Sequence, residues 1–224
     1  MLDDKRSAGL AAEEACFEVH STLQVLPLLT SPSEVPFGDG LYFFYEDGET
    51  SEHAPDGRVV RVGNHPHSDG SLRKRLAQHF SGRKNGSVFR KFLGGALLRR
   101  RDPGCLCLAP APGKGHWDLQ DAKTCPECRP LEADVSALLR TSFRFRCVMI
   151  EDRPERNELE ELLIATLAAC PVCRASPSWL GQYAYSEKVR SSGLWNSRGV
   201  GGPIISRRQL DRFQSLARAS AEAF

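Results

Sequence analysis

The segment Gly40-Leu41-Tyr42-Phe43-Phe44-Tyr45 most narrowly limits how this chain can fold. It is rich in aromatic side chains and lies between the turn residues Gly38-Asp39-Gly40 and Asp47-Gly48, a pattern typical of a buried β-strand. A second run, Arg58-Val59-Val60-Arg61-Val62-Gly63, follows the turn Asp56-Gly57. The two runs predict a β-hairpin with an acidic, solvated connecting loop.

Apolar side chains beyond the hairpin mostly recur with helical spacing. Leu72, Leu76 and Phe80 are four residues apart and form the buried stripe of a helix that Ser71 can cap. Residues 143–150 alternate in the manner of a strand instead. Further helices are expected within 1–20 and over 87–99, 131–140, 155–169 and 206–223. With 224 residues the chain is long enough for one sizeable core and short for two, so we expect one α/β domain.

Membrane and secretory classes do not fit the sequence. The longest nearly continuous apolar run, 162–170 with Thr166 as its one polar residue, is far shorter than the roughly 20 residues of a membrane-spanning helix. The start, Met1-Leu2-Asp3-Asp4, lacks the basic and apolar segments of a secretory signal. We therefore expect a cytoplasmic protein, in which the 8 cysteines are thiols or metal ligands rather than disulfides.

The charges are unevenly distributed, although the formal net charge is only +2. The stretch 73–101 contains ten Lys or Arg and no Asp or Glu, while the acids gather in 46–56 and 151–161. A stretch of this kind is either a solvated basic face or a surface for a polyanion. The side chains expected to contact nucleic acid are Arg61, Arg73, Lys74, Arg83, Lys84, Arg90 and Lys91.

Glu160 is the acid of the 155–169 helix whose position is unusual. At 100° per residue it falls between Ile164 and Leu167 on the flank of the apolar face, whereas Glu161 points the opposite way. A carboxylate at such an edge needs a cation, which is either an arginine or a metal ion, unless it reaches solvent. Helical phase therefore selects Glu160 as the candidate metal ligand.

Taken in order, these segments resemble the GIY-YIG nuclease superfamily, and within it the restriction-endonuclease-like branch. Gly40-Leu41-Tyr42 corresponds to the first motif and Arg61-Val62-Gly63 to the second. The helix Leu72-Arg73-Lys74-Arg75-Leu76 is similar to the arginine helix, and Leu159-Glu160-Glu161-Leu162-Leu163-Ile164 to the glutamate helix. Gly193-Leu194-Trp195-Asn196 resembles the segment with the asparagine, so the resemblance spans roughly 37–196.

The resemblance implies a GIY-YIG-type α/β sandwich, in which a three-stranded antiparallel sheet is flanked by helices. We expect an N-terminal helical extension over 1–36, a nuclease-like domain over 37–205 with a Cys-rich insertion over 102–129, and a C-terminal helix over 206–224. It further implies hydrolysis of phosphodiester bonds in duplex or branched DNA with one Mg²⁺ or Mn²⁺.

Site roles follow from the same resemblance. Glu160 would hold the catalytic metal, which stabilises the leaving oxygen, and Arg75 would stabilise the phosphate charge. Tyr42 would orient or deprotonate the attacking water, and Asn196 would position phosphate or support the metal. His79, one turn after Arg75, would act as a base or hold phosphate.

The sequence departs from the family pattern at two places. Arg61 replaces the tyrosine of the second motif, and the loop 64–70 is longer than usual. Because arginine cannot act as a base near neutral pH, either Tyr42 works alone or His65, His67 or His79 assists it. The alternative function is a nucleic-acid-binding module that has lost hydrolysis.

Six of the cysteines lie in three close pairs. Two of these pairs are C-P-x-C turns, which suit tetrahedral zinc. A structural zinc site would combine Cys105, Cys107, Cys125 and Cys128 inside the insertion, or else Cys125 and Cys128 with Cys170 and Cys173; unligated thiols are the third possibility. His116 is a substitute ligand, and Cys16 and Cys147 stand alone. A zinc-knuckle interaction protein is accordingly a further alternative function.

Overall fold

The computed structural model describes residues 2–65, 72–105, 108, 126 and 128–224. Its centre is a sheet of three antiparallel strands, β1 (Gly40–Glu46), β2 (Val59–Gly63) and β3 (Phe143–Met149), in the order β2-β1-β3. Tyr42 pairs with Gly63 on one side and with Cys147 on the other. The predicted hairpin and third strand are confirmed, and β1 is the central strand because its two partners pair along opposite edges.

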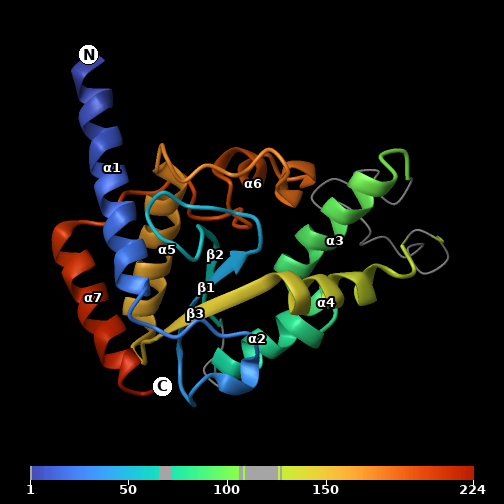
Figure 1. Cartoon of the computed structure of the whole chain (residues 1–224), viewed down its shortest axis with the longest axis horizontal. Helices are drawn as coiled ribbons and strands as arrows, with labels where there is room; N and C mark the ends of the chain where they lie inside the picture. The colour runs from blue at the N-terminus through green and yellow to red at the C-terminus, as the bar shows by residue number, and fades with distance from the viewer. Residues whose placement is uncertain (1, 66–71, 106–107, 109–125, 127) are drawn as a thin grey trace.

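Helices cover both faces of the sheet (Figure 1). The described helices are α1 (Leu2–Leu23), α2 (Leu72–Ser81), α3 (Val88–Arg101), α4 (Leu131–Ser142), α5 (Arg153–Ala169), α6 (Glu187–Ser192) and α7 (Arg207–Ala221). Side chains of α2, α3 and α4 share one core with Tyr42 and Phe44, and those of α1, α5 and α7 share the other with Leu41 and Phe43. Alternation along β1 thus sends successive side chains into the two cores, and the predicted α/β sandwich is confirmed.

The helices begin where local sequence dictates. The Ser87 hydroxyl accepts the Arg90 N–H at the start of α3, and Asp152 does the same for Glu155 at the start of α5. Ser206 and Gln209 form a reciprocal capping box at α7. Ser71, the expected cap of α2, lies outside the described residues.

Both edges of the sheet are covered. The Trp195 N–H donates to the Val60 carbonyl at the outer edge of β2 at 2.7 Å, and Leu29 forms an antiparallel bridge with Phe145 at the outer edge of β3. Covered edges leave few unpaired backbone groups for another chain. The segment that carries Asn196 is thereby fixed along β2.

No described helix is long and apolar enough to cross a membrane.

The loop between β1 and β2 differs from the expectation of a solvated acidic segment. Glu49 is only 5% exposed and pairs with the buried Arg58 guanidinium at 2.7 Å. Glu46 accepts the indole N–H groups of Trp179 and Trp195 at 2.9 and 3.0 Å. That prediction is wrong for these two acids, because Glu49 accepts from the buried Arg58 and from the distant Ser176, and Glu46 accepts from two indoles that are distant in sequence.

Candidate active site

Tyr42 and His79 form a buried pair where α2 packs on β1. The Tyr42 hydroxyl lies 2.8 Å from His79 Nε2, and His79 Nδ1 lies 2.7 Å from the Ser87 hydroxyl. Both rings have no exposed surface. Leu72 and Leu76 anchor α2 in the core, and this anchoring directs His79 at the sheet.

The surroundings of His79 favour its neutral imidazole. Burial lowers the pKa of His79 well below its ordinary value of 6.5, and the charges of Arg75, Arg61 and Arg90 act in the same direction. A neutral imidazole has one donor and one acceptor nitrogen. With Nδ1–H donating to Ser87, Nε2 is free to accept the Tyr42 proton, so the pair can exchange that proton.

The two motif glycines have a steric purpose. A Cβ on Gly63 would lie 2.2 Å from the Tyr42 hydroxyl oxygen, and one on Gly40 would lie 2.3 Å from the Val148 carbonyl oxygen. Only glycine therefore lets the Tyr42 ring cross the end of β2. This contact explains why the second motif ends in glycine opposite the tyrosine of the first.

Glu160 approaches the end of β2 from α5. It is half-buried, whereas the neighbouring Glu161 is exposed, as helical phase predicts. Its Oε1 accepts the Asn64 N–H at 3.2 Å, and the Asn64 side chain donates to Asn157 at 2.9 Å. Burial raises the pKa of Glu160, while the charges of Arg61 and Arg75 and the Asn64 N–H bond oppose that rise. The charges of two guanidinium groups thus act on this carboxylate.

The guanidinium groups of both arginines are held by backbone carbonyls. Arg61 donates to the Trp195 carbonyl and stands 4.9 Å from the centre of the Phe89 ring. Arg75 donates to the Gly86 carbonyl at 2.8 Å. Because both charges act on His79 and on Glu160, the residues from the family motifs share one electrostatic environment.

The side-chain amide of Asn196 is hydrogen-bonded to the backbone of β2. Its side-chain oxygen accepts the Val62 N–H at 3.1 Å and its amide nitrogen donates to the Val62 carbonyl at 2.8 Å. The side chain, 6% exposed, thereby acts as one more strand residue at this edge. It positions the backbone that leads to Asn64 and so to Glu160.

The histidines of the 64–70 loop separate into two cases. His65 is buried and lies 2.7 Å from Asp39, which also pairs with Arg156 at 3.3 Å. His67 lies outside the described residues. Of the two described histidines among these candidates, His65 and His79, it is His79 that contacts Tyr42.

The basic stretch is not one surface. Arg73, Lys74 and Arg83 are exposed and Lys84 and Lys91 are half-buried. Arg90 is completely buried, pairs with Glu132 at 2.8 Å and donates to the His79 carbonyl at 2.8 Å. Its expected contact with nucleic acid is therefore wrong, because its guanidinium joins α2, α3 and α4 in the interior.

A second site unites cysteines that the sequence analysis had kept apart. One ligand atom each from Cys16, His53, Cys170 and Cys173 lies within 4.8 Å of the others. The alternative zinc site that joined Cys170 and Cys173 to the insertion is corrected: within the described ranges their neighbours are Cys16 and His53. Cys107, Cys125 and His116 lie outside those ranges, so the site within the insertion stays a prediction.

No local spacing pointed to Cys16 or His53. Cys16 has no cysteine nearby in sequence and His53 lies in the loop expected to be solvated. The one available signal was the C-P-x-C turn at Cys170, which requires two further ligands from elsewhere.

The sequence model of the GIY-YIG domain matches residues 22–222, which is most of the chain. No curated protein and no solved structure matches it.

Proposed function

Because the chain belongs to the GIY-YIG domain family, we propose that it is a divalent-metal-dependent endonuclease that hydrolyses phosphodiester bonds in DNA. The observation that carries this proposal is the buried Tyr42–His79 hydrogen bond, together with two arginines whose charges act both on His79 and on the half-buried Glu160. These are the residue types that phosphodiester hydrolysis needs. The restriction-endonuclease-like branch and the preference for duplex or branched DNA stay predictions.

Tyr42 and His79 would accept the proton of the attacking water. In this step the water gives a proton to the Tyr42 oxygen while the Tyr42 proton passes to His79 Nε2, 2.8 Å away. Ser87 fixes the imidazole through Nδ1. A neutral His79 is required for this transfer, and its burial supports that state.

Arg75 and Arg61 would bind and stabilise the phosphate. In each guanidinium, one nitrogen donates to a backbone carbonyl. The other nitrogens also bear N–H groups, and neither Nε has a hydrogen-bond partner among the described residues. Fixed guanidinium donors can stabilise the charge that develops on a phosphoryl oxygen. In this proposal Arg61 takes over phosphate contact where the family has a second tyrosine.

Glu160 suits a hard divalent cation. Its carboxylate uses Oε1 for one backbone N–H and keeps further lone pairs for a metal, and Mg²⁺ or Mn²⁺ prefers such oxygen ligands. A metal bound at this carboxylate supplies charge stabilisation for the leaving oxygen. Asn196 would act by fixing the end of β2, since its amide oxygen and one of its amide N–H groups bond to the Val62 backbone.

Cleavage of duplex and branched DNA with Mg²⁺ or Mn²⁺ tests the proposal. We expect Glu160→Gln and Tyr42→Phe to reduce cleavage at least 100-fold, within the range for loss of a single catalytic group. Glu161→Gln, one residue away on the exposed side of α5, is the matched control and keeps full activity. Absence of cleavage by the wild-type protein on every substrate would refute the endonuclease.

Binding without hydrolysis is the second candidate. Two observations favour it: Tyr42 has no exposed surface, and Arg61 replaces the second-motif tyrosine. It predicts DNA affinity that decreases with salt and is unaffected by metal and by Glu160→Gln. In either case Arg83→Gln, which alters an exposed arginine, is expected to lower the salt slope by about one phosphate contact.

A further inference from the structure

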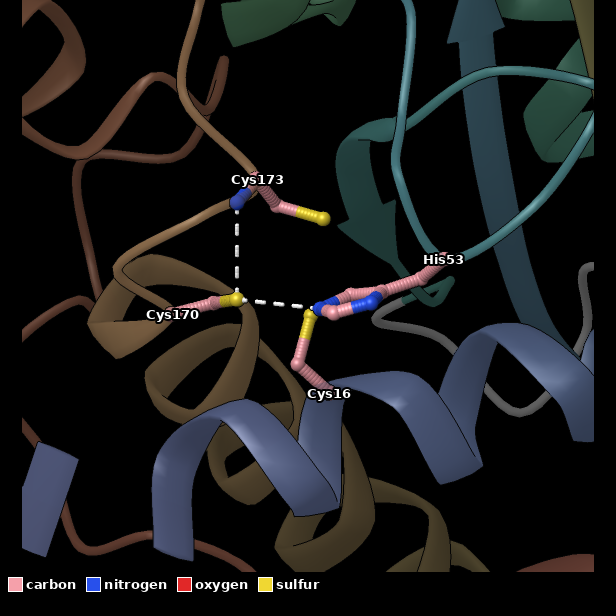
Figure 2. Close-up of side chains that lie close together, drawn as sticks. All are labelled: Cys16, His53, Cys170 and Cys173. Atoms are coloured by element: carbon pink, nitrogen blue, oxygen red, sulfur yellow. Dashed lines mark hydrogen bonds between the residues drawn. The ribbon is translucent and has the colours of Figure 1, made fainter. Parts of the chain in front are cut away.

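We propose that Cys16, His53, Cys170 and Cys173 bind one Zn²⁺ as a structural site separate from the nuclease centre. Figure 2 shows the four side chains pointing toward one another from three parts of the chain. Cys16 comes from the middle of α1, His53 from the loop between β1 and β2, and Cys170 and Cys173 from the turn that follows α5. The proposal does not depend on nuclease activity.

The spacing of the ligand atoms fits tetrahedral zinc. With zinc–sulfur and zinc–nitrogen bonds of about 2.3 and 2.0 Å, neighbouring ligand atoms are roughly 3.5 to 3.8 Å apart. His53 Nε2 lies 3.4 Å from Cys170 Sγ, and all four ligand atoms lie within 4.8 Å of one another. Small side-chain adjustments would therefore close the tetrahedron.

The backbone around Cys170 already has the form of a zinc knuckle. Cys170 ends α5, Pro171 turns the chain, and the Cys173 N–H points back at Cys170 Sγ at 3.5 Å. An N–H directed at sulfur stabilises a metal-bound thiolate. This turn presents two sulfurs to one point in space, and Cys16 and His53 complete the set.

Other polar groups surround the sulfurs as a metal site requires. The Ser51 hydroxyl lies 3.3 Å from Cys173 Sγ and His20 Nε2 lies 3.7 Å from the same sulfur. Donors at these positions orient ligands and reduce the negative charge on thiolates. Since Cys16, Cys170 and Cys173 are at most 8% exposed, the site is closed to substrate, which is typical of structural zinc.

A disulfide does not explain the cluster equally well. One disulfide joins two sulfurs and would leave the third thiol and His53 facing it. In the structure Cys16, Cys170 and Cys173 are all unbonded thiols. Three soft sulfurs and one imidazole select Zn²⁺ over Mg²⁺, which prefers oxygen ligands.

The site would add metal–ligand bonds between segments that already meet through side-chain packing and a few hydrogen bonds, among them those from Ser176 to Glu49. It fixes the irregular loop between β1 and β2 to α1 and to the end of α5, the helix that also carries Glu160. Coordination of this kind adds directly to folding free energy, because the unfolded chain has no preformed site. We therefore assign the zinc a role in holding the layer of α1 and α5 on the sheet.

Metal analysis of the full chain, purified without added metal, tests the site. We expect Cys170→Ser and His53→Ala each to lose one equivalent of zinc relative to wild type. Cys147→Ala, which alters a buried cysteine outside the cluster, should retain this zinc ion. The Cys105→Ser/Cys128→Ser double variant should retain it too, and any zinc that the double variant loses would belong to the insertion. Equal zinc content in wild type, Cys170→Ser and His53→Ala would overturn the proposal.

A second measurement covers variants that fail to fold. Protein produced in cobalt-containing medium should show the visible bands of tetrahedral Co²⁺ with thiolate ligands. His53→Cys, which preserves four ligands, should keep the metal and shift these bands toward those of a four-sulfur site. Absence of tetrahedral thiolate bands in the wild-type protein, or a spectrum that His53→Cys leaves unchanged, would refute the assignment. Mass spectrometry that finds a disulfide among the three cysteines in freshly isolated protein would equally contradict it.

Discussion

Glu46 offers a sharp test of how burial controls charge in this fold. It lies at the end of β1, half-buried, where Oε2 accepts the indole N–H groups of Trp179 and Trp195. Burial raises the pKa of Glu46 from 4.5 to about 7, in spite of the two indole donors, which lower it. We predict that Glu46→Gln removes a pH-dependent loss of stability while retaining an acceptor for both indoles.

The sign follows from proton binding. Between pH 4.5 and 7 the folded protein holds a proton on Glu46 that the unfolded chain has already released, so stability falls as the pH rises. The full difference corresponds to about 3 kcal/mol. Because Glu46 keeps some contact with solvent, which weakens the effect, we expect Glu46→Gln to gain about 2 kcal/mol relative to wild type between pH 5 and pH 8.

Urea denaturation at a series of pH values measures this difference. Glu52→Gln is the matched control, since Glu52 is exposed in the loop that follows β1 and its substitution should leave the pH profile unchanged. The relative stability of Glu46→Gln should rise with pH and become constant above about pH 8. A constant difference between Glu46→Gln and wild type from pH 5 to pH 8 would refute the reasoning.

Three further substitutions test the packing of the site. Gly63→Ala places a Cβ against the Tyr42 hydroxyl; it should lower the free energy of unfolding in urea by about 1–3 kcal/mol and abolish any DNA cleavage. The control Gly201→Ala, whose Cβ meets nothing within 4 Å, should leave stability unchanged. Equal stability of the two variants would contradict the steric role. Arg90→Met removes the donors to the His79 and Glu132 carbonyls and should cost about 1–3 kcal/mol, whereas the exposed Arg83→Met should stay within about 0.5 kcal/mol; a similar small effect of both would show that Arg90 is not structural. Asn196→Asp cannot donate to the Val62 carbonyl and should cost about 1–3 kcal/mol by thermal or urea unfolding, with the exposed Asn85→Asp as control; unchanged stability would mean that the amide does not hold β2.

The elements of the fold were predictable because their signals are local. The four-residue spacing of Leu72, Leu76 and Phe80 predicts α2, and the structure has that helix over Leu72–Ser81. The alternation of residues 143–150 likewise predicts β3. The short helix α6 was not predicted, because six residues are too few for a periodic pattern.

The partners of charged residues were not predictable in this way. Arg90 looked like a neighbour of Lys91 in a basic stretch, yet it is buried against Glu132 and the His79 carbonyl. Glu49 looked like part of a solvated loop, yet it pairs with Arg58 and accepts the Ser176 hydroxyl. Burial of a charge depends on donors that arrive from distant segments, and a linear pattern does not reveal them.

By itself the sequence determined the order of strands and helices, the family, and the phase that turns Glu160 rather than Glu161 toward the end of β2. These properties depend on backbone periodicity and on short motifs, which act over a few residues. Tertiary structure alone decided that His79 rather than His65 meets Tyr42, and that Cys170 and Cys173 find Cys16 and His53. The reason is physical: these contacts join segments brought together by packing two helical layers on one sheet, and their geometry exists only once both cores have formed.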